Sequence, residues 1–151
     1  MIDTSKKFLV AGAGKSGIGS VNLLLKTGAD VSLYDGNEEL DKEALFEKLY
    51  EKKEISLVLG NITKEDIEKY DLLVLSPGIS VNAPIAQMFY DQEKPVWSEI
   101  ELAYQASKGK IAAITGTNGK TTTTALTGEI MKGYYESSFV VGNIGIPYTS
   151  V

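Results

Sequence analysis

The sequence predicts an α/β fold in which a doubly wound parallel sheet carries helices on both faces. Short apolar runs alternate with longer amphipathic stretches, and glycine-rich turns follow two of the apolar runs. The composition is that of a globular chain, with 43% hydrophobic and 23% charged residues. A length of 151 residues accommodates one ordinary domain, or one small domain and the start of another.

The elements of the first part follow from the spacing of the apolar residues. Strands are expected at 8–11, 31–34, 57–59 and 72–75, and helices at 16–26, 40–52 and 83–90. Within the second of these helices, Leu45 and Leu49 share a face at i, i+4. A short strand is expected at 92–97, and Ser98 followed by Glu101 is the signature of a helix start.

A second α/β unit is expected to begin near residue 109. Ile111–Thr115 reads as a strand, a helix runs to about Lys132, and another strand lies near Phe139–Val141. One helix and two strands cannot bury both faces of a parallel sheet, so we expect this second unit to be incomplete.

Composition and charge exclude several classes of function. The net charge is −5, and the 15 Lys and Arg residues are scattered, which argues against a nucleic-acid partner. With no Cys and no His, chemistry must use carboxylates, Lys, hydroxyls or backbone N–H groups. No apolar run approaches the roughly 18 residues of a membrane span, so we expect a cytoplasmic protein without a membrane partner.

The first motif is Gly12-Ala13-Gly14-Lys15-Ser16-Gly17, between an expected strand and an expected helix. Its glycines permit a tight turn, and free N–H groups at the helix N-terminus favour a pyrophosphate. Asp35, 18 residues beyond Gly17, ends the second strand, where its carboxylate could accept a hydrogen bond from a ribose or uridine group. The alternative is a tight turn with an ordinary terminal Asp.

Ser76-Pro77-Gly78-Ile79 follows another strand and therefore lies at the same carboxyl edge of the sheet. Its glycine would let the backbone approach a ligand. The alternative is a Pro-Gly turn that only ends the strand.

The strongest signal is the loop Thr115–Thr122, with the sequence T-G-T-N-G-K-T-T, again between an apolar run and a helix. Its backbone N–H groups suit phosphate oxygens, Lys120 can reach terminal phosphates, and the Thr121 hydroxyl can ligate Mg²⁺. The loop departs from the general P-loop pattern because Ile114 stands where the leading glycine would be.

The motifs divide the chain into three predicted parts. Residues 1–97 form a Rossmann-like domain, 98–108 a connecting helix and linker, and 109–151 the start of a P-loop ATPase-like domain. A NAD-dependent dehydrogenase fragment would account for Gly12–Gly17 and Asp35 but not for the second loop. A P-loop switch protein and a non-catalytic nucleotide-binding module are further alternatives.

Taken together, these motifs resemble the Mur ligase family, whose central domain carries a T-G-T-N-G-K-[ST]-[ST] loop. Thr115–Thr122 matches that loop throughout. The order of the other segments resembles the branch of the family that joins D-glutamate to UDP-N-acetylmuramoyl-L-alanine. These segments are Gly12–Gly17, Ser76–Ile79, Ile100–Leu102 and Gly142–Gly145.

The resemblance implies two sets of site residues. The first set would contact the UDP end of the sugar-nucleotide substrate: Gly14, Lys15, Ser16, Gly17, Asp35, Gly36, Asn37, Ser76, Gly78 and Asn143. The second set would hold the triphosphate of ATP: Gly116, Thr117, Asn118, Gly119, Lys120, Thr121 and Thr122. Within that set, Lys120 would stabilise the transferring phosphoryl group and Thr121 would help to hold Mg²⁺.

The reaction implied by the resemblance is phosphorylation of the substrate carboxylate by ATP, followed by attack of the D-glutamate amine on the acyl phosphate. The chain covers about the first third of such an enzyme, so we expect no turnover from it alone. The complete enzyme is expected to be a monomer, whereas unpaired strand edges would let the shorter chain self-associate.

Overall fold

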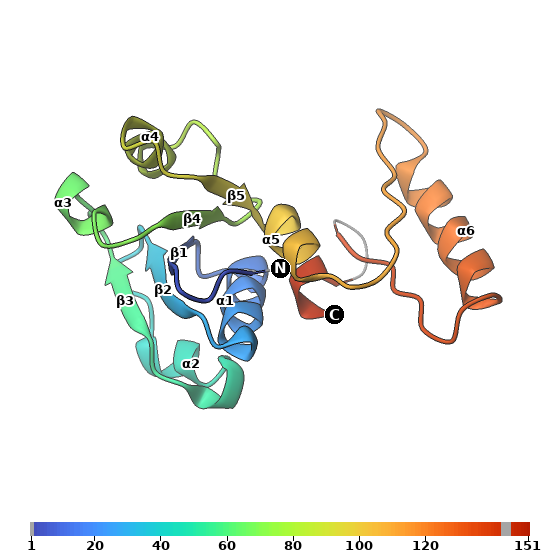
Figure 1. Cartoon of the computed structure of the whole chain (residues 1–151), viewed down its shortest axis with the longest axis horizontal. Coiled ribbons are helices and arrows are strands. Elements are labelled where there is room, and N and C mark those ends of the chain that lie inside the picture. Colours follow the sequence, from blue (N-terminus) through green and yellow to red (C-terminus); the bar gives the residue numbers. More distant parts are fainter. Residues whose placement is uncertain (1, 143–145) are drawn as a thin grey trace.

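The first part of the chain builds a five-stranded sheet wrapped by helices (Figure 1). The computed structural model describes residues 2–142 and 146–151. The strands are β1 (Lys7–Ala11), β2 (Asp30–Asp35), β3 (Ser56–Leu59), β4 (Leu72–Leu75) and β5 (Val96–Ser98). The helices of this part are α1 (Lys15–Thr27), α2 (Lys42–Phe46), α3 (Lys64–Ile67), α4 (Pro84–Asp91) and α5 (Glu99–Ala106), with a 3₁₀ turn, η1 (Tyr50–Lys52).

All neighbouring strands are parallel, in the order β3-β2-β1-β4-β5. The central strand is β1, in which Val10 pairs with Leu33 of β2 on one side and with Val74 of β4 on the other. The chain therefore adds β2 and β3 on one side of β1, and then crosses over to add β4 and β5 on the other side. This arrangement leaves a crevice at the carboxyl ends of β1 and β4, where open α/β sheets bind their ligands.

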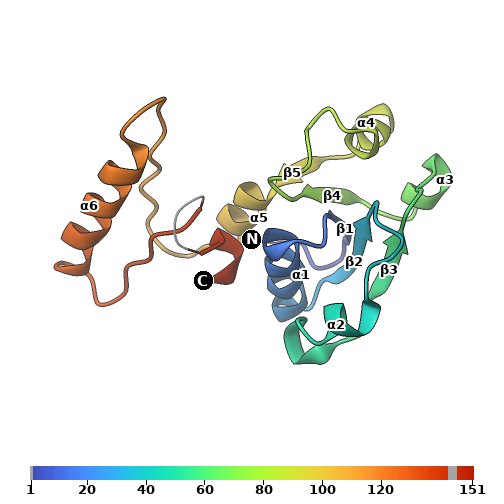
Figure 2. The same cartoon turned by 180° about the vertical axis from the view of Figure 1, so that it is seen from behind.

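Alternation along the strands divides the core between the two faces of the sheet. Phe8 and Val10 of β1 pack with α1, α2 and α5, whereas Leu9 and Ala11 pack with α3 and α4. Each face is thus covered, as Figures 1 and 2 show from opposite sides. The four residues of β4 are all buried, which is the pattern of a strand covered on both sides. The predicted fold class is confirmed.

The predicted helix at 40–52 is wrong in its extent. Only α2 is helical, followed by η1, in which Glu51 has a positive φ of 54°. Leu45 and Leu49 are both buried, as their spacing predicts. The helix stops because Asn22 of α1 takes over the hydrogen bonding: its Oδ1 accepts from the N–H of Tyr50 at 2.6 Å.

One helix, α3, was not expected from the sequence. It is a single turn whose start is fixed by a capping box, in which Thr63 and Asp66 bond each other's backbone N–H. The predicted cap at Ser98 is confirmed, since its hydroxyl accepts from the N–H of Glu101 at 3.1 Å.

The second part of the chain contains α6 (Lys120–Lys132) and a closing 3₁₀ turn, η2 (Tyr148–Ser150). The predicted helix is confirmed, but the strands predicted at Ile111–Thr115 and Phe139–Val141 are wrong, apart from an isolated bridge between Val141 and Ile146. A strand needs a neighbour to bond along its length; among the described residues the first run has none, and the second has only the single bridge at Val141. In both views α6 stands apart from the sheet, while η2 packs against α1 and α5 (Figure 2).

The predicted division into 1–97, 98–108 and 109–151 stays a prediction. Leu102 of α5 is fully buried in the core beside α1, so the connecting helix packs on the sheet.

Candidate nucleotide site

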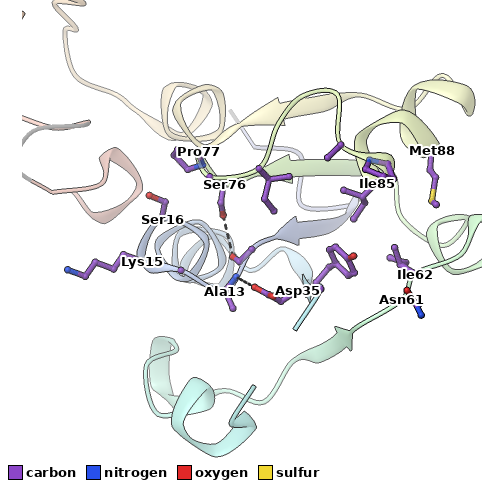
Figure 3. A pocket seen from close by; sticks show the side chains of 18 residues that line it. Ala13, Lys15, Ser16, Asp35, Asn61, Ile62, Ser76, Pro77, Ile85 and Met88 are labelled. Carbon is purple, nitrogen blue, oxygen red and sulfur yellow. Dashed lines mark hydrogen bonds between the residues drawn. The ribbon is translucent and has the colours of Figure 1, made fainter. Parts of the chain in front are cut away.

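A pocket of about 830 Å³ opens at the carboxyl edge of β1, β2 and β4. Its walls come from the loops that follow four strands and from the start of α4 (Figure 3). The lining residues are Gly12, Ala13, Gly14, Lys15, Ser16, Tyr34, Asp35, Gly36, Asn61, Ile62, Ser76, Pro77, Gly78, Ile79, Ala83, Pro84, Ile85 and Met88. The pocket therefore lies where the strand order reverses.

The turn from β1 into α1 is shaped by two of its glycines. Gly12 has φ = +97°, a conformation that disfavours side chains, and its N–H donates to the carbonyl of Tyr34 at 2.7 Å. Gly17 is required for a steric reason instead, because a Cβ there would lie 1.7 Å from the carbonyl oxygen of Gly12. The first turn of α1 is thereby held directly against the end of β1.

The close approach of α1 makes its N-terminus part of the pocket. Helical N–H groups of the first turn have no intrahelical acceptor, and the helix dipole adds partial positive charge there. The exposed Lys15 adds a full positive charge, and its side chain extends away from the pocket in Figure 3. This end of the pocket suits an anion such as a diphosphate.

Asp35 has a structural role in the turn. Its Oδ2 accepts from the N–H of Ala13 at 2.8 Å, and its Oδ1 accepts from the N–H of Asn37 at 2.9 Å. Each carboxylate oxygen has a second lone pair, so the group can still accept a hydrogen bond from a ligand. The residue both braces the turn and presents an acceptor to the pocket.

Ser76 joins the two loops of the crevice. It is buried, and its hydroxyl donates to the carbonyl of Gly12 at 3.3 Å. The loop after β4 is thus tied to the loop after β1, as the dashed line in Figure 3 shows.

The far end of the pocket is apolar. Ile62, Ile85 and Met88 line it, from the loop after β3 and from α4 (Figure 3). Sequence reasoning missed these residues. A signal was present for the first, because Asn61 and Ile62 follow a predicted strand at the same edge of the sheet. A pocket with an anion-binding end and an apolar end suits an elongated ligand that carries both characters.

The structure brings most of the predicted UDP residues together. Those that line the pocket are Gly14, Lys15, Ser16, Asp35, Gly36, Ser76 and Gly78. Gly17 lies behind Gly12 and does not line the pocket, and neither does Asn37, whose N–H turns to Asp35. Asn143 lies outside the described residues.

The second predicted site, Gly116–Thr122, is an exposed loop that enters α6 and does not line the pocket. Gly116 and Gly119 have positive φ of 147° and 75°, so the loop uses conformations that glycine favours. The ammonium of Lys120 donates to the carbonyl oxygens of Gly116 and Thr117. Within the described residues no cluster of three or more His, Asp or Glu side chains gathers as a metal site.

The sheet and its crevice define a Rossmann-like α/β domain with an open pocket at the topological switch point. No helix among the described residues has the length and apolarity to cross a bilayer. Comparison of the sequence with family models matches residues 6–98 to the Mur ligase MurD-like N-terminal domain. The chain belongs to this family.

Curated relatives extend the similarity beyond that domain. The chain is 54% identical to the UDP-N-acetylmuramoylalanine–D-glutamate ligase of Lachnospira eligens over 145 residues, which are 96% of this chain and 32% of the relative. It is 53% identical to the ligase of the same name from Lachnoclostridium phytofermentans, over 97% of this chain and 32% of the relative. The chain thus spans about a third of the length of these relatives.

Solved structures agree on the fold. A pseudomurein peptide ligase type C from Methanothermus fervidus superposes with a TM-score of 0.55 at 26% identity, covering 84% of this chain and 26% of that one. The UDP-N-acetylmuramate-alanine ligase MurC of Thermotoga maritima gives a TM-score of 0.52 at 24% identity, over 84% of this chain and 29% of that one. At that identity the second likeness concerns the fold alone.

Proposed function

We propose that this chain is the nucleotide-binding front part of a ligase that adds D-glutamate to UDP-N-acetylmuramoyl-L-alanine with ATP. The observation that carries the proposal is the pocket at the switch point, where seven residues predicted for UDP converge. The names of the curated relatives support the choice of substrate.

In this proposal the pocket holds the UDP end of the substrate. The first-turn N–H groups of α1 and the Ser16 hydroxyl bind the diphosphate, and Lys15 contributes charge. Asp35 accepts a hydrogen bond from the nucleoside, for which its oxygens keep free lone pairs. Tyr34 and Ile62, both half-buried, offer apolar contact to the flat base.

The loop Gly116–Thr122 is proposed to hold the triphosphate of ATP, which supplies the phosphoryl group. The residues present fit this group: an αL glycine, Gly119, precedes α6, so the loop leads into the positive end of a 13-residue helix. Lys120 would exchange its two loop carbonyls for phosphate oxygens and neutralise their charge. The Thr121 hydroxyl would be one ligand of Mg²⁺.

The proposed reaction places the sugar-nucleotide carboxylate in line with the terminal phosphate of ATP. The carboxylate oxygen forms the new P–O bond and ADP leaves; the D-glutamate amine then displaces phosphate to give the amide. Catalysis of such a transfer rests mainly on positioning and on neutralisation of charge. Lys120 is the residue of this chain proposed to act on the reacting phosphate.

Calorimetric titration of UDP tests the pocket. We expect Lys15→Ala to weaken UDP binding severalfold, because it removes a cation at the N-terminus of α1; its exposed side chain, directed away from the pocket in Figure 3, would turn toward a bound diphosphate. The matched control is Lys26→Ala, which removes the same charge from the last turn of the same helix. Equal affinity of both variants for UDP would reject Lys15 as a contact of the diphosphate. Binding of NADH in place of UDP would support a dehydrogenase fragment instead.

Titration of ATP with Mg²⁺ tests the loop separately. Lys120→Ala should weaken ATP binding by about tenfold or more, since a charge-assisted contact to phosphate is lost. Lys132→Ala, at the other end of α6, is the control and should leave binding unchanged. Wild-type affinity in Lys120→Ala would refute the role of the loop.

A further inference from the structure

The end of the described chain, η2, returns to the first part of the chain and packs between α1 and α5 (Figure 1). Thr149 of η2 is only 4% exposed there, and Glu99, the first residue of α5, is 3% exposed. One oxygen of Glu99 accepts two hydrogen bonds from Thr149, from the backbone N–H and from the hydroxyl, each at 3.0 Å. The contact joins residues that are 50 positions apart.

A buried carboxylate needs hydrogen-bond donors or a cation. Among residues 2–142 and 146–151, no salt bridge reaches Glu99. The donors that the structure provides for its side chain are those of Thr149. With η2 docked, these two hydrogen bonds stand in for the water that would otherwise solvate the carboxylate, so the docked segment both covers the acid and satisfies one of its oxygens.

A hollow on α1 completes the contact. Gly19 is buried under η2, and a Cβ at this position would lie 2.6 Å from Oγ1 of Thr149. The hollow thus admits the threonine side chain only because residue 19 has none. Gly19 lies three residues after Ser16, and Glu99 follows Ser98, which pairs with Leu75 beside the pocket. The contact therefore joins α1, whose first turn lines the pocket, to α5, which follows β5.

We propose that Glu99 and Gly19 form a docking site for Tyr148–Ser150, and that this contact latches the second part of the chain onto the first. The other connection between the two parts is the segment 107–119, which has no regular secondary structure and precedes α6. A chain fixed at α5 and again at η2 restricts where the loop Gly116–Thr122 can lie. Glu99 and Gly19 are positioning residues in this sense, independently of which ligand the pocket binds.

Amide exchange measured by NMR on the whole chain tests the latch. The Thr149 N–H should be protected in the wild type, and Gly19→Ala should speed its exchange about tenfold or more, because the added methyl ejects η2. The amides of Leu9 and Val10 in β1 report whether the sheet itself has opened, and should not change. Fast exchange of the Thr149 amide in the wild type, or equal protection in Gly19→Ala, would overturn the proposal.

A double variant distinguishes loss of docking from a direct effect of Gly19→Ala on α1. In Gly19→Ala combined with Thr149→Ala the clash with Oγ1 disappears, and the nearest remaining atoms are Oγ of Ser150 at 3.3 Å and Cβ of residue 149 at 3.6 Å. The hydroxyl bond to Glu99 is lost, but the bond from the residue 149 N–H is kept. The residue 149 amide should regain part of its protection relative to Gly19→Ala alone. If the double variant exchanges as fast as the single one, the hollow is not a docking site.

Spin labels measure the consequence for the second part. The chain contains no Cys, so Asp30→Cys on β2 and Ala125→Cys on α6, both exposed, give a unique label pair. We expect one narrow distance distribution in this background and a clearly broader one after Gly19→Ala or Glu99→Ala. Distributions of equal width would show that η2 does not restrain the second part.

Discussion

Substitution of Gly17 by alanine should destabilise the protein through a backbone clash. The new Cβ would lie 1.7 Å from the carbonyl oxygen of Gly12 and 2.8 Å from Oγ of Ser76. The first of these atoms belongs to the backbone at the end of β1, so α1 must move by more than an ångström. Overpacking of this kind lowers the free energy of unfolding by about 3 kcal/mol, the upper end of the usual range. Alanine returns about 1 kcal/mol through its higher helix propensity, which leaves a net loss of about 2 kcal/mol.

Thermal unfolding followed by circular dichroism measures this loss. For a chain of this size, about 2 kcal/mol corresponds to a decrease of about 4 to 8 °C in Tm. The matched control is Gly14→Ala in the same turn, where a Cβ meets nothing within 4 Å and φ is −71°. Its cost should stay within about 1 kcal/mol, since alanine is a poorer N-cap than glycine. If both variants unfold at the same temperature, close packing of α1 on β1 is not what requires Gly17.

Phe89→Ala should cost about 3 to 5 kcal/mol in urea unfolding because the ring is fully buried; its neighbour Tyr90 is 44% exposed, so Tyr90→Ala should change stability by less than about 1 kcal/mol. Hydrogen bonds from the backbone and hydroxyl of Thr63 lower the pKa of Asp66 below 3.8. The ionised cap therefore contributes fully above pH 3.8 and is lost as the pH falls through the lowered value, and an NMR titration of Thr63→Ala should find the Asp66 pKa nearer 3.8. Asp35→Ala should weaken UDP binding and also speed amide exchange in the adjacent turn, which its carboxylate braces; loss of binding with unchanged exchange would contradict the bracing role.

The sequence was sufficient to predict the sheet of the first part. Runs such as Leu72–Leu75 are apolar at every position, and this pattern is typical of a strand covered on both faces. The carboxyl edge could also be predicted, since Gly12–Gly17 and Ser76–Ile79 each follow a strand. Parallel strands bring such loops together whatever their distance in sequence.

What could not be predicted depends on contacts between distant residues. The helix expected at 40–52 is interrupted because Asn22 bonds Lys48 and Tyr50, and spacing along the chain contains no sign of that. The runs at 111–115 and 139–141 have the composition of strands, but composition does not provide a hydrogen-bonding neighbour. The double role of Asp35 was hidden as well, because a carboxylate that braces a turn and one that binds a ligand look alike in sequence.

The tie between Ser76 and Gly12 has a consequence for the thermodynamics of ligand binding. The loop after β4 is joined to the loop after β1 through Ser76 and Gly12, and the loop after β1 is joined to the end of β2 through Gly12 and Tyr34. The loops of the crevice therefore lose little backbone conformational entropy when a ligand binds. The heat-capacity change on binding should then be proportional to the apolar area that the ligand buries. The large additional decrease that accompanies ordering of a loop on binding should be absent.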